Sequence, residues 1–577
     1  MRSSLGRVLL ASASALVIAS PAWAQSSAFS DYRPVTNEML QNPDDGDWLS
    51  FRRTQNSWGF SPLAQITPDN ITGLDLVWAR GMDAGYNATT PLVHDGVMFL
   101  PNPNNVIFAL DASNGDMLWE YRRTLPEGTV GRNRSIAMYE DKIFTISADN
   151  FLVAVDALSG QLVWEVALAD PGENPNNAGP LIVNGMVVSG KSCPQAGPPE
   201  SCYVAAYDTA SGEELWRTLT IPSPGDPADE SWAGVPYDSR AHVGSWMVPS
   251  YDPVTDLIYI GTSVTSPYAK FYFADPEDVD DDYLYQTSTL ALDPETGEIV
   301  WYFQHMRDQW DLDHPFERVL VDTAVTPNPD AVAWINPNLT PGEERQVLTG
   351  IPGKTGLFYS IDRATGEFLW ARETIYQTAI LDLDPATGRA TMNLGEGVGP
   401  TAVGQDVEIC PGGYGGGKSW HVSSYSPDSN VLFVPLLYHC MVMHVEEDDL
   451  QPGPLFLPPG EENNGSIWAI NVETGEEVWR YEQTHPVGSV VATASGLLFA
   501  GDLNRRFRAF DQSNGDILWE TILGGSIVGV PVSYEVDGRQ YVSVATGPFP
   551  VDPWILEFHP DLQATVGNTL YTFALSE

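Results

Sequence analysis

Hydrophobic and polar residues alternate in short runs along nearly the whole chain. Runs such as PLVHDGVMFL, which ends at Leu100, and SYDPVTDLIYIG, which ends at Gly261, have a period close to two and are separated by Gly, Asp and Asn. This period is typical of strands with one buried face, and the intervening residues are those that favour turns. The pattern therefore predicts an all-β protein built from hairpins.

A sequence repeat organises these hairpins. Seven segments of the form A-x-[DN]-x-x-[TSN]-G-x-x-x-W occur, counting Ser360 as a variant of the first Ala, and they end at Trp119, Trp164, Trp216, Trp301, Trp370, Trp479 and Trp519. In each segment a strand runs into Asp or Asn, whose side chain favours a turn. Gly then supplies the positive φ of that turn, and a second strand ends in Trp, a ring large enough to fill space between neighbouring units.

Most copies are preceded by another hairpin, so a unit has four strands, which is one blade of a β-propeller. Intervals between the repeat tryptophans range from 40 to 109 residues, whereas a four-stranded blade needs about 40–45. The longer intervals therefore carry insertions, where a functional site is often built. Strands at Leu74–Arg80 and Thr569–Leu575 are suited to form a shared closing blade. We predict a single eight-bladed propeller domain over residues 25–577.

The first 24 residues differ from the rest. Arg2 and Arg7 are followed by a small and apolar stretch and by Ala22-Trp23-Ala24, the pattern of a secretory signal peptide. Each later run of apolar residues is shorter than the roughly 18 residues that a membrane-spanning helix needs. Removal of residues 1–24, with two Arg and no acid, changes the formal net charge from −48 to −50. A surface this acidic disfavours nucleic-acid binding.

Four cysteines are present. Proximity favours the pairs Cys193–Cys202 and Cys410–Cys440, one of three possible connectivities. We expect two structural disulfides in an oxidising compartment. No C-x-x-C-H sequence occurs, so no covalently attached haem is expected.

The repeat and the opening segment DDGDWLSFRRTQNSWGFSPLAQITPDNITGLDLVW resemble the quinoprotein alcohol dehydrogenases, the pyrroloquinoline quinone (PQQ) enzymes of the bacterial periplasm. The resemblance extends to the final NTLYTFALSE. Within the family, LVWARGM, TPLVHDGVM and EFLWARET are most similar to the sorbose and sorbosone dehydrogenase branch, which includes enzymes for bulky secondary alcohols such as deoxynivalenol. The resemblance implies a PQQ cofactor and one metal ion, Ca²⁺ or a lanthanide.

The most specific chemical motif is Asp308-Gln309-Trp310-Asp311-Leu312-Asp313. It resembles the family's D-x-W-D segment, in which the Asp after Trp is the catalytic base, so the resemblance implies that Asp311 takes the hydroxyl proton of an alcohol. Asp313 resembles the extra carboxylate of members that use lanthanides, and both aspartates are candidate metal ligands.

Cofactor-binding residues follow from the resemblance position by position. It implies that Arg134 pairs with a PQQ carboxylate, that Trp246 lies beneath the quinone ring, and that Lys354 hydrogen-bonds the quinone oxygens. The remaining candidate cofactor contacts are Ser147, Gly179, Ser419, Trp420 and Gly547.

The chain also departs from the family pattern. The adjacent cysteine pair of the family is absent, Gln195 stands at the position of a metal-binding Glu, and Val264 stands at the position of a metal-binding Asn. Gln195 is retained as a candidate metal ligand, with Glu200 nearby as an alternative. These departures leave the complete set of metal ligands open.

We therefore expect a periplasmic dehydrogenase that oxidises a sugar, a polyol or a bulky secondary alcohol and passes electrons to an external acceptor such as a soluble cytochrome c. The acidic surface would favour a basic acceptor. The alternative is a non-enzymatic exported propeller that serves as a scaffold or assembly protein. The sequence leaves monomer and homodimer open.

Overall fold

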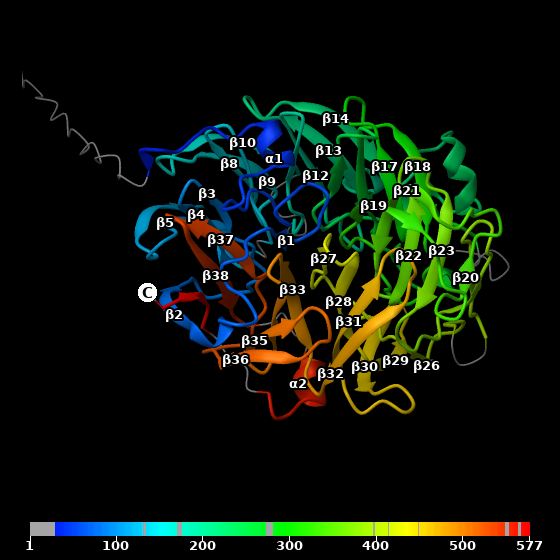
Figure 1. The fold of residues 1–577 in the computed structure, drawn as a ribbon. Helices are drawn as coiled ribbons and strands as arrows, with labels where there is room; N and C mark the ends of the chain where they lie inside the picture. The colour runs from blue at the N-terminus through cyan, green and yellow to red at the C-terminus, as the bar shows by residue number, and fades with distance from the viewer. Residues whose placement is uncertain are drawn as a thin grey trace, which may run out of the picture.

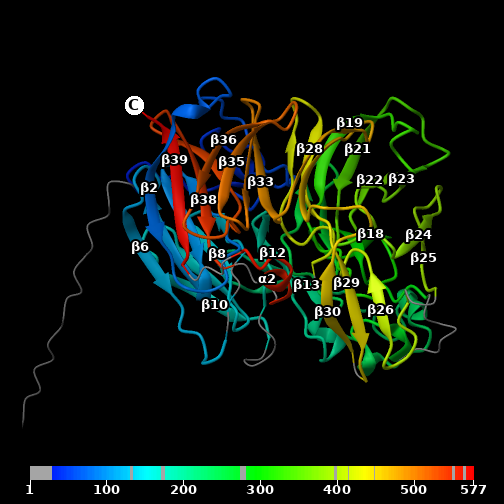
Figure 2. The ribbon, with the colours of Figure 1, turned by 90° about the horizontal axis from the view of Figure 1, so that it is seen from below.

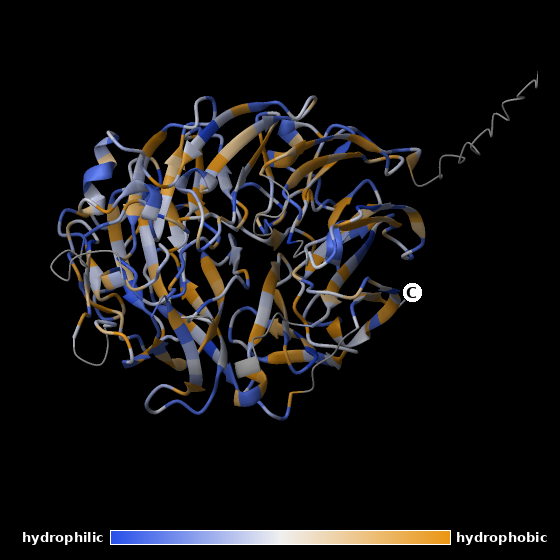
Figure 3. Cartoon of the chain, turned by 180° about the vertical axis from the view of Figure 1, so that it is seen from behind, coloured by the Kyte–Doolittle hydropathy of each residue, from blue (hydrophilic) through white to orange (hydrophobic). Residues whose placement is uncertain are grey.

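In the computed structural model, the described residues are 29–129, 131, 134–169, 176–272, 281–395, 399–413, 415–447, 449–548, 553–562 and 567–576. The expected signal peptide lies outside them. Eight sheets of four strands or more, antiparallel except for the pairing of β1 with β33, follow one another around a ring in chain order, as the colours of Figure 1 show. Hydrophobic and hydrophilic positions alternate along many of these strands, as the sequence pattern predicts (Figure 3).

The first four sheets take their strands directly in sequence. Their bounds are β3 (Leu92–His94), β4 (Val97–Asn102), β5 (Val106–Asp111) and β6 (Met117–Arg122); β7 (Ala137–Tyr139), β8 (Lys142–Ile146), β9 (Phe151–Asp156) and β10 (Leu162–Ala167); β11 (Leu181–Val183), β12 (Met186–Gly190), β13 (Tyr203–Asp208) and β14 (Glu214–Leu219); and β15 (Ser250–Asp252), β16 (Leu257–Gly261), β17 (Ser288–Leu292) and β18 (Ile299–Gln304).

The other four sheets contain insertions or strands from distant parts of the chain. Their bounds are β19 (Val319–Val325), β21 (Glu343–Gly350), β22 (Leu357–Asp362), β23 (Phe368–Glu373) and β20 (Trp334–Ile335); β27 (Ser424–Ser426), β28 (Val431–Leu437), β31 (Gly465–Asn471) and β32 (Glu477–Gln483); β1 (Phe60–Ser61), β33 (Val487–Thr493), β34 (Leu497–Asp502), β35 (Arg506–Asp511) and β36 (Ile517–Ile522); and β37 (Val532–Val536), β38 (Arg539–Thr546), β39 (Thr569–Leu575) and β2 (Leu74–Gly81).

Strands from the two ends of the chain close the ring. β2 pairs antiparallel with β39 from Leu74↔Leu575 to Gly81↔Thr569, and the two strands lie side by side in Figure 2. The predicted closing blade is therefore confirmed. It joins the two ends of the chain within one blade.

The repeat residues join each sheet to the next. The glycine of each repeat has a positive φ, and the Trp ring of the preceding sheet lies so close that an added Cβ would fall within about 3 Å of it. The pairs are Trp78–Gly115, Trp119–Gly160, Trp164–Gly212, Trp216–Gly297, Trp301–Gly366, Trp370–Gly475 and Trp479–Gly515. Several indoles also donate a hydrogen bond to the backbone of the next sheet, as Trp119 Nε1 does to Ala157 O at 2.9 Å. The tryptophans thus hold the ring together.

Smaller elements complete the molecule. They are the helices α1 (Asn37–Gln41) and α2 (Pro553–Phe558), the hairpin of β24 (Ile380–Leu383) and β25 (Ala390–Met392), and the sheet of β26 (Asp406–Ile409), β29 (Cys440–Val445) and β30 (Leu450–Phe456). Cys193 is bonded to Cys202 and Cys410 to Cys440, which confirms the predicted pairing. Within the described residues, no helix is long and apolar enough to cross a membrane.

The two ends of the ring differ. Strand direction alternates within a sheet, so loops between a fourth strand and the next first strand emerge at the same end as loops between second and third strands. We call this end the site end. At the other end, residues within 41–58 of the N-terminal segment border a cavity of about 400 Å³ that Arg363 also lines. The Arg363 guanidinium is paired with Asp252 and Asp322, so its charge is already compensated there.

Candidate active site

Every predicted site residue lies in a loop of the site end. Arg134, Gly179, Trp246, Asp311, Asp313, Ser419 and Trp420 lie between the last strand of one sheet and the first of the next, whereas Ser147, Gln195, Lys354 and Gly547 lie between second and third strands. Residues distributed over more than 400 positions of sequence therefore share one face of the ring. The repeat architecture alone accounts for this convergence.

Two aspartates and a lysine form the centre of the site. Lys354 Nζ lies 3.2 Å from Asp311 Oδ1 and 3.3 Å from Asp313 Oδ2, and it donates to the backbone oxygen of Asp311 at 2.9 Å. All three side chains are buried. Both carboxylates thus face one point in space, where a single cation can pair with both.

The three groups differ in charge preference. Burial raises the pKa of Asp311 well above its usual value, although the charge of Lys354 opposes the shift. Burial would also raise the pKa of Asp313, but Lys354 and the Val264 amide, which donates to Asp313 Oδ1 at 3.1 Å, lower it overall. Burial acts against the Lys354 ammonium, yet the two carboxylates outweigh it and raise the lysine pKa. The arrangement therefore holds Asp313 as the anion and makes Asp311 the carboxylate with the greater affinity for a proton.

The backbone around these groups is tightly held. Asp311 has a φ of +65°, which is unusual for a non-glycine residue. The amide of Lys354 donates to Asp313 O at 2.9 Å, and His314 Nδ1 donates to Leu312 O at 2.8 Å. The His314 ring leaves no room for a side chain at Gly353, where an added Cβ would lie 2.3 Å from it. These contacts fix the two loops that carry the carboxylates and the lysine relative to each other.

Glycines of the run PGGYGGG pack against the same centre. An added Cβ on Gly413 would lie 2.0 Å from Trp310 O, and one on Gly416 would lie 2.3 Å from Lys354 Cβ. Only glycine allows the backbone to approach this closely. This segment was not predicted as part of the site, although the run PGGYGGG is visible in the sequence.

A cationic and aromatic group adjoins the carboxylates along the ring. The Arg134 guanidinium lies 4.7 Å from the ring centroid of Trp246 and 5.3 Å from that of Trp420. Trp246 makes an edge contact with Phe316 at 5.5 Å between centroids. An arginine placed against two flat indoles suits a planar anion, because the rings offer stacking surfaces and the guanidinium matches a carboxylate.

A buried ion pair, Lys418–Glu317, lies next in sequence to the aromatic residues of this group. Lys418 Nζ lies 2.8 Å from both carboxylate oxygens of Glu317, and the Ser423 amide donates to Glu317 Oε1 at 2.8 Å. Lys418 directly precedes Ser419 and Trp420, and Glu317 follows Phe316. The pair therefore ties the loop that carries Trp420 to the loop that carries the aspartates.

The other predicted contacts have varied surroundings. The Ser147 hydroxyl donates to Phe151 O at 3.2 Å and accepts from its amide at 3.0 Å, so it is used within the β8–β9 turn. An added Cβ on Gly179 would lie 2.6 Å from Ser135 Oγ, and one on Gly547 would lie 2.2 Å from Asn568 Oδ1. Ser419 is half-buried. Both glycines therefore mark positions of close packing.

The two departures from the expected metal ligands are visible as well. Gln195 is exposed and its amide nitrogen donates to the Tyr268 hydroxyl, whereas the Val264 side chain is buried and apolar. The Tyr268 ring lies 5.9 Å from that of His242. His242 has a φ of +74° and a buried Nδ1 without a hydrogen-bond partner among the described residues, and burial lowers its pKa while the charge of Asp313 opposes the shift. No short motif marks this histidine, because its neighbours Tyr268 and Asp313 lie in distant loops.

A second buried acid–base pair was also missed. Burial raises the pKa of Asp308 to about 6 and lowers that of Lys270 to about 7, while each charge opposes the shift of the other. Lys270 Nζ donates to Tyr268 O at 2.9 Å, and the Lys270 amide donates to Gln309 Oε1 at 2.7 Å. Buried lysines therefore lie at both ends of the motif, Lys270 near Asp308 and Lys354 beside Asp311 and Asp313.

The sequence matches the family described as glucose/ethanol/alcohol dehydrogenase, β-propeller domain, of the PQQ type, over residues 48–374 and 482–542. It is 30% identical to the quinoprotein alcohol dehydrogenase PedH of Pseudomonas putida, with 89% of this chain and 88% of that protein covered. It is 29% identical to 1-butanol dehydrogenase (cytochrome c) of Thauera butanivorans, with 92% and 78% covered.

Solved structures give the same result. The quinohemoprotein alcohol dehydrogenase ADH-IIG of Pseudomonas putida superposes with a TM-score of 0.82 at 26% identity, over 95% of this chain and 83% of that one. A europium-containing methanol dehydrogenase superposes with a TM-score of 0.80 at 25% identity, over 93% of this chain and 100% of that one.

Proposed function

The chain belongs to the PQQ-dependent alcohol dehydrogenase family, and on that premise we propose that it oxidises an alcohol at the site formed by Asp311, Asp313 and Lys354. The observation that carries this assignment is the convergence of both carboxylates on Lys354 Nζ, at 3.2 and 3.3 Å. Family membership favours an enzyme over the non-enzymatic scaffold that the sequence left open.

Asp311 is the proposed general base. Its raised pKa gives the carboxylate a high proton affinity, which suits removal of a proton from an alcohol hydroxyl. Lys354 holds the Asp311 carboxylate and backbone in one orientation and places a positive charge beside the reacting oxygens. When bound, PQQ supplies the hydride acceptor, and its metal ion polarises the acceptor carbonyl.

The residues present fit such a cofactor. Arg134 would pair with a carboxylate of PQQ, Trp246 would lie beneath its planar rings, and Trp420 would contact the cofactor, since Arg134 lies beside both indoles. Ser147, Gly179, Ser419 and Gly547 complete the proposed binding segments. Ser147 and the two glycines would contribute through backbone position, since the Ser147 hydroxyl is engaged in its own turn.

Asp311 and Asp313 are the proposed metal ligands. Oxygen donors suit calcium and lanthanide ions, and two converging carboxylates favour the higher charge of a lanthanide. A relative that contains europium has the same fold. Gln195 is the weakest of the three proposed ligands, because its amide group is exposed and bonded to Tyr268.

Substrate and acceptor are proposed from the sequence and its relatives. We assign a sugar, a polyol or a bulky secondary alcohol as the substrate class and a soluble cytochrome c as the acceptor, since one relative is named as a cytochrome c-linked 1-butanol dehydrogenase. The net charge of −48 would attract a basic acceptor. Residues 1–24 are the proposed signal peptide for export to the periplasm, and residues 25–577 the proposed single domain.

Reconstitution tests this proposal. Purified protein freed of cofactor would be loaded with PQQ and either CaCl₂ or LaCl₃, and dye-linked oxidation of sugars, polyols and bulky secondary alcohols would be followed. We expect activity only with PQQ and an ion together. Asp313→Ala should lose more activity with lanthanum than with calcium. Activity without PQQ, or equal losses with both ions, would contradict the assigned roles.

A further inference from the structure

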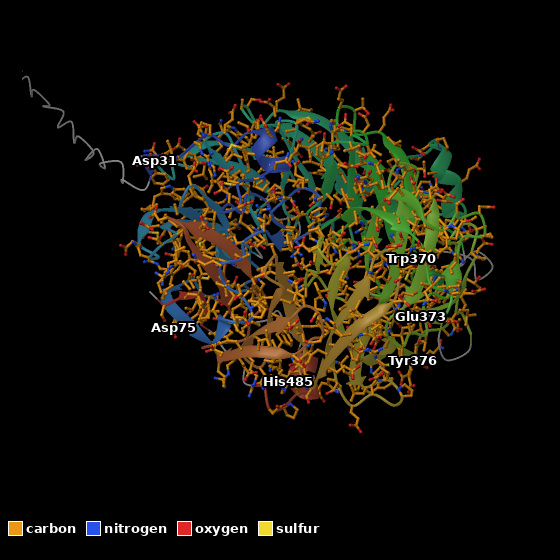
Figure 4. All side chains as sticks on the ribbon, in the orientation of Figure 1. Asp31, Asp75, Trp370, Glu373, Tyr376 and His485 are labelled. Carbon is orange, nitrogen blue, oxygen red and sulfur yellow. A yellow bond between two sulfur atoms is a disulfide. The ribbon has the colours of Figure 1, made fainter. Side chains whose placement is uncertain are left out.

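A second group of metal-binding side chains lies on the site end, away from the carboxylates. His485 lies in the loop between β32 and β33, and His559 and Asp561 follow helix α2 in the connection from β38 to β39. His485 is labelled at the lower edge of the ring in Figure 4, where Figure 1 shows α2. Two neighbouring blades therefore contribute the three side chains.

The three side chains converge. His485 Nε2 lies 2.7 Å from Asp561 Oδ2, and the centroids of the two imidazole rings are 5.3 Å apart. One ligand atom from each of His485, His559 and Asp561 lies within 4.8 Å of the other two. Ligands of a tetrahedral zinc ion are separated by roughly 3.3–3.5 Å, given Zn–N and Zn–O distances near 2.1 Å. Side-chain movements of about 1 Å would therefore bring the ligand atoms to a metal.

The hydrogen bonds of Asn464 orient His559 for this role. Asn464 Nδ2 donates to Tyr438 O at 3.0 Å, so its Oδ1 faces His559 Nε2, at 3.0 Å, as an acceptor. The proton of a neutral His559 ring is thereby placed on Nε2, which leaves the lone pair on Nδ1. Metal-binding histidines commonly donate their second ring nitrogen to a carbonyl oxygen in this way.

A second histidine–carboxylate group lacks this arrangement. In the group of Asp47, His94 and Asp95, both ring nitrogens of His94 already make hydrogen bonds, to Asp47 Oδ2 at 2.7 Å and to Arg33 O at 2.8 Å. Arg33 also binds the Asp95 carboxylate at 2.6 Å. That group is a closed ionic network. Of the two groups found among the described residues, only that of His559 keeps a ring nitrogen, Nδ1, for a metal ion.

We propose that His485, His559 and Asp561 bind one divalent transition metal ion of the zinc class, independently of the cofactor site. Two imidazoles and one carboxylate are ligands that suit zinc, whereas calcium and lanthanide ions prefer oxygen ligands alone. Three protein ligands leave a fourth position for water. The ion would join the segment after α2, in the closing blade, to the preceding blade at the site end.

The site would also lie close to the active-site loops. Asn464, which accepts from His559 Nε2, donates to Tyr438 O, and the ring of the next residue, His439, lies beside Gly412 and Gly415. The same glycine-rich segment packs on Lys354 through Gly416. Metal binding would therefore restrict the motion of the glycine-rich segment that packs on Lys354. It would leave Asp311 and Asp313 themselves uncontacted.

Zinc titration of the untagged, PQQ-loaded and calcium-loaded enzyme tests this proposal. ZnCl₂ binding would be measured by calorimetry and by metal analysis after gel filtration, and CoCl₂ would report ligand geometry through its visible spectrum. We expect one equivalent of zinc in the presence of excess calcium and a tetrahedral cobalt spectrum. Asp561→Asn and His485→Gln should each weaken binding by at least about a hundredfold.

His444→Gln is the matched control. His444 Nδ1 lies 2.6 Å from Asp406 Oδ1, an exposed histidine–carboxylate pair that has no third such ligand among the described residues. This variant should bind zinc like the wild type. Absence of stoichiometric zinc binding in the wild type, unchanged binding in Asp561→Asn, or an equal loss in His444→Gln would each overturn the proposal. Asp561 is largely exposed, so its variant should fold, and circular dichroism without zinc checks this.

Discussion

Lys354 provides a test of whether the two aspartates form one cation site. Replacing it by Met leaves Asp311 and Asp313 buried and facing each other without the ammonium that lies 3.2 and 3.3 Å from them. Removing one partner of a buried ion pair typically costs about 3–5 kcal/mol. We expect Lys354→Met to lose about that much of its free energy of unfolding in cofactor-free buffer with a chelator.

Lanthanum should compensate for this loss. With the competing ammonium gone, La³⁺ at about 100 times its dissociation constant would return about 2.7 kcal/mol. The free energy of unfolding would be measured in guanidinium chloride with and without LaCl₃. The stabilisation by lanthanum should be larger for Lys354→Met than for the wild type.

Lys418→Met is the matched control. Lys418 is also buried, and its partner is Glu317, at 2.8 Å, instead of Asp311 or Asp313. It should lose a similar free energy of unfolding, yet respond to lanthanum only as the wild type does. Equal lanthanum stabilisation of both variants, or none in Lys354→Met, would refute the idea that Asp311 and Asp313 share a cation.

Two other predictions concern the stability of the ring. Gly160→Ala should lower the free energy of unfolding by about 1–2 kcal/mol because its φ is +69°, and by about 1–3 kcal/mol more because its Cβ would overlap Trp119. Gly538→Ala should show only the first loss, because Gly538 has a φ of +76° and no neighbour within 4 Å. Equal losses in chemical denaturation would contradict the docking role of the tryptophan. Burial raises the pKa of Asp252, but backbone hydrogen bonding and Arg363 lower it overall. The aspartate therefore stabilises the fold above its unfolded pKa of about 3.9. Asp252→Asn should be less stable at pH 7, and its difference from the wild type should shrink as pH falls below about 4; a constant difference would contradict the ion pair.

The sequence predicted the ring well because the repeat is local. Asp or Asn, Gly and Trp occupy fixed positions within eleven residues, so their turn and strands can be recognised without tertiary information. The partner of each tryptophan could not be assigned in this way. Trp119, for example, lies against Gly160 of the next repeat, and this contact appears only when the sheets are packed.

The candidate site could be assembled from the sequence only in part. Motifs singled out Asp311, Asp313 and Lys354 as candidates, but the contact of one ammonium with both carboxylates depends on two loops that are about 40 residues apart in sequence. His485 and His559 lie in different blades and fit no short metal-binding spacing. Such clusters become visible only once the ring brings distant loops to one end.

The most direct test of the central assignment is Asp311→Asn in enzyme loaded with PQQ and metal. After PQQ and metal contents have been matched to the wild type, the rate of a single reductive half-reaction with an alcohol would be followed by absorbance in a stopped-flow instrument. Loss of a general base should slow this step by about 10²–10⁴-fold, while Asp313→Asn with equal loading should be affected less. A rate for Asp311→Asn within a few-fold of the wild type would contradict the assignment of Asp311 as the base.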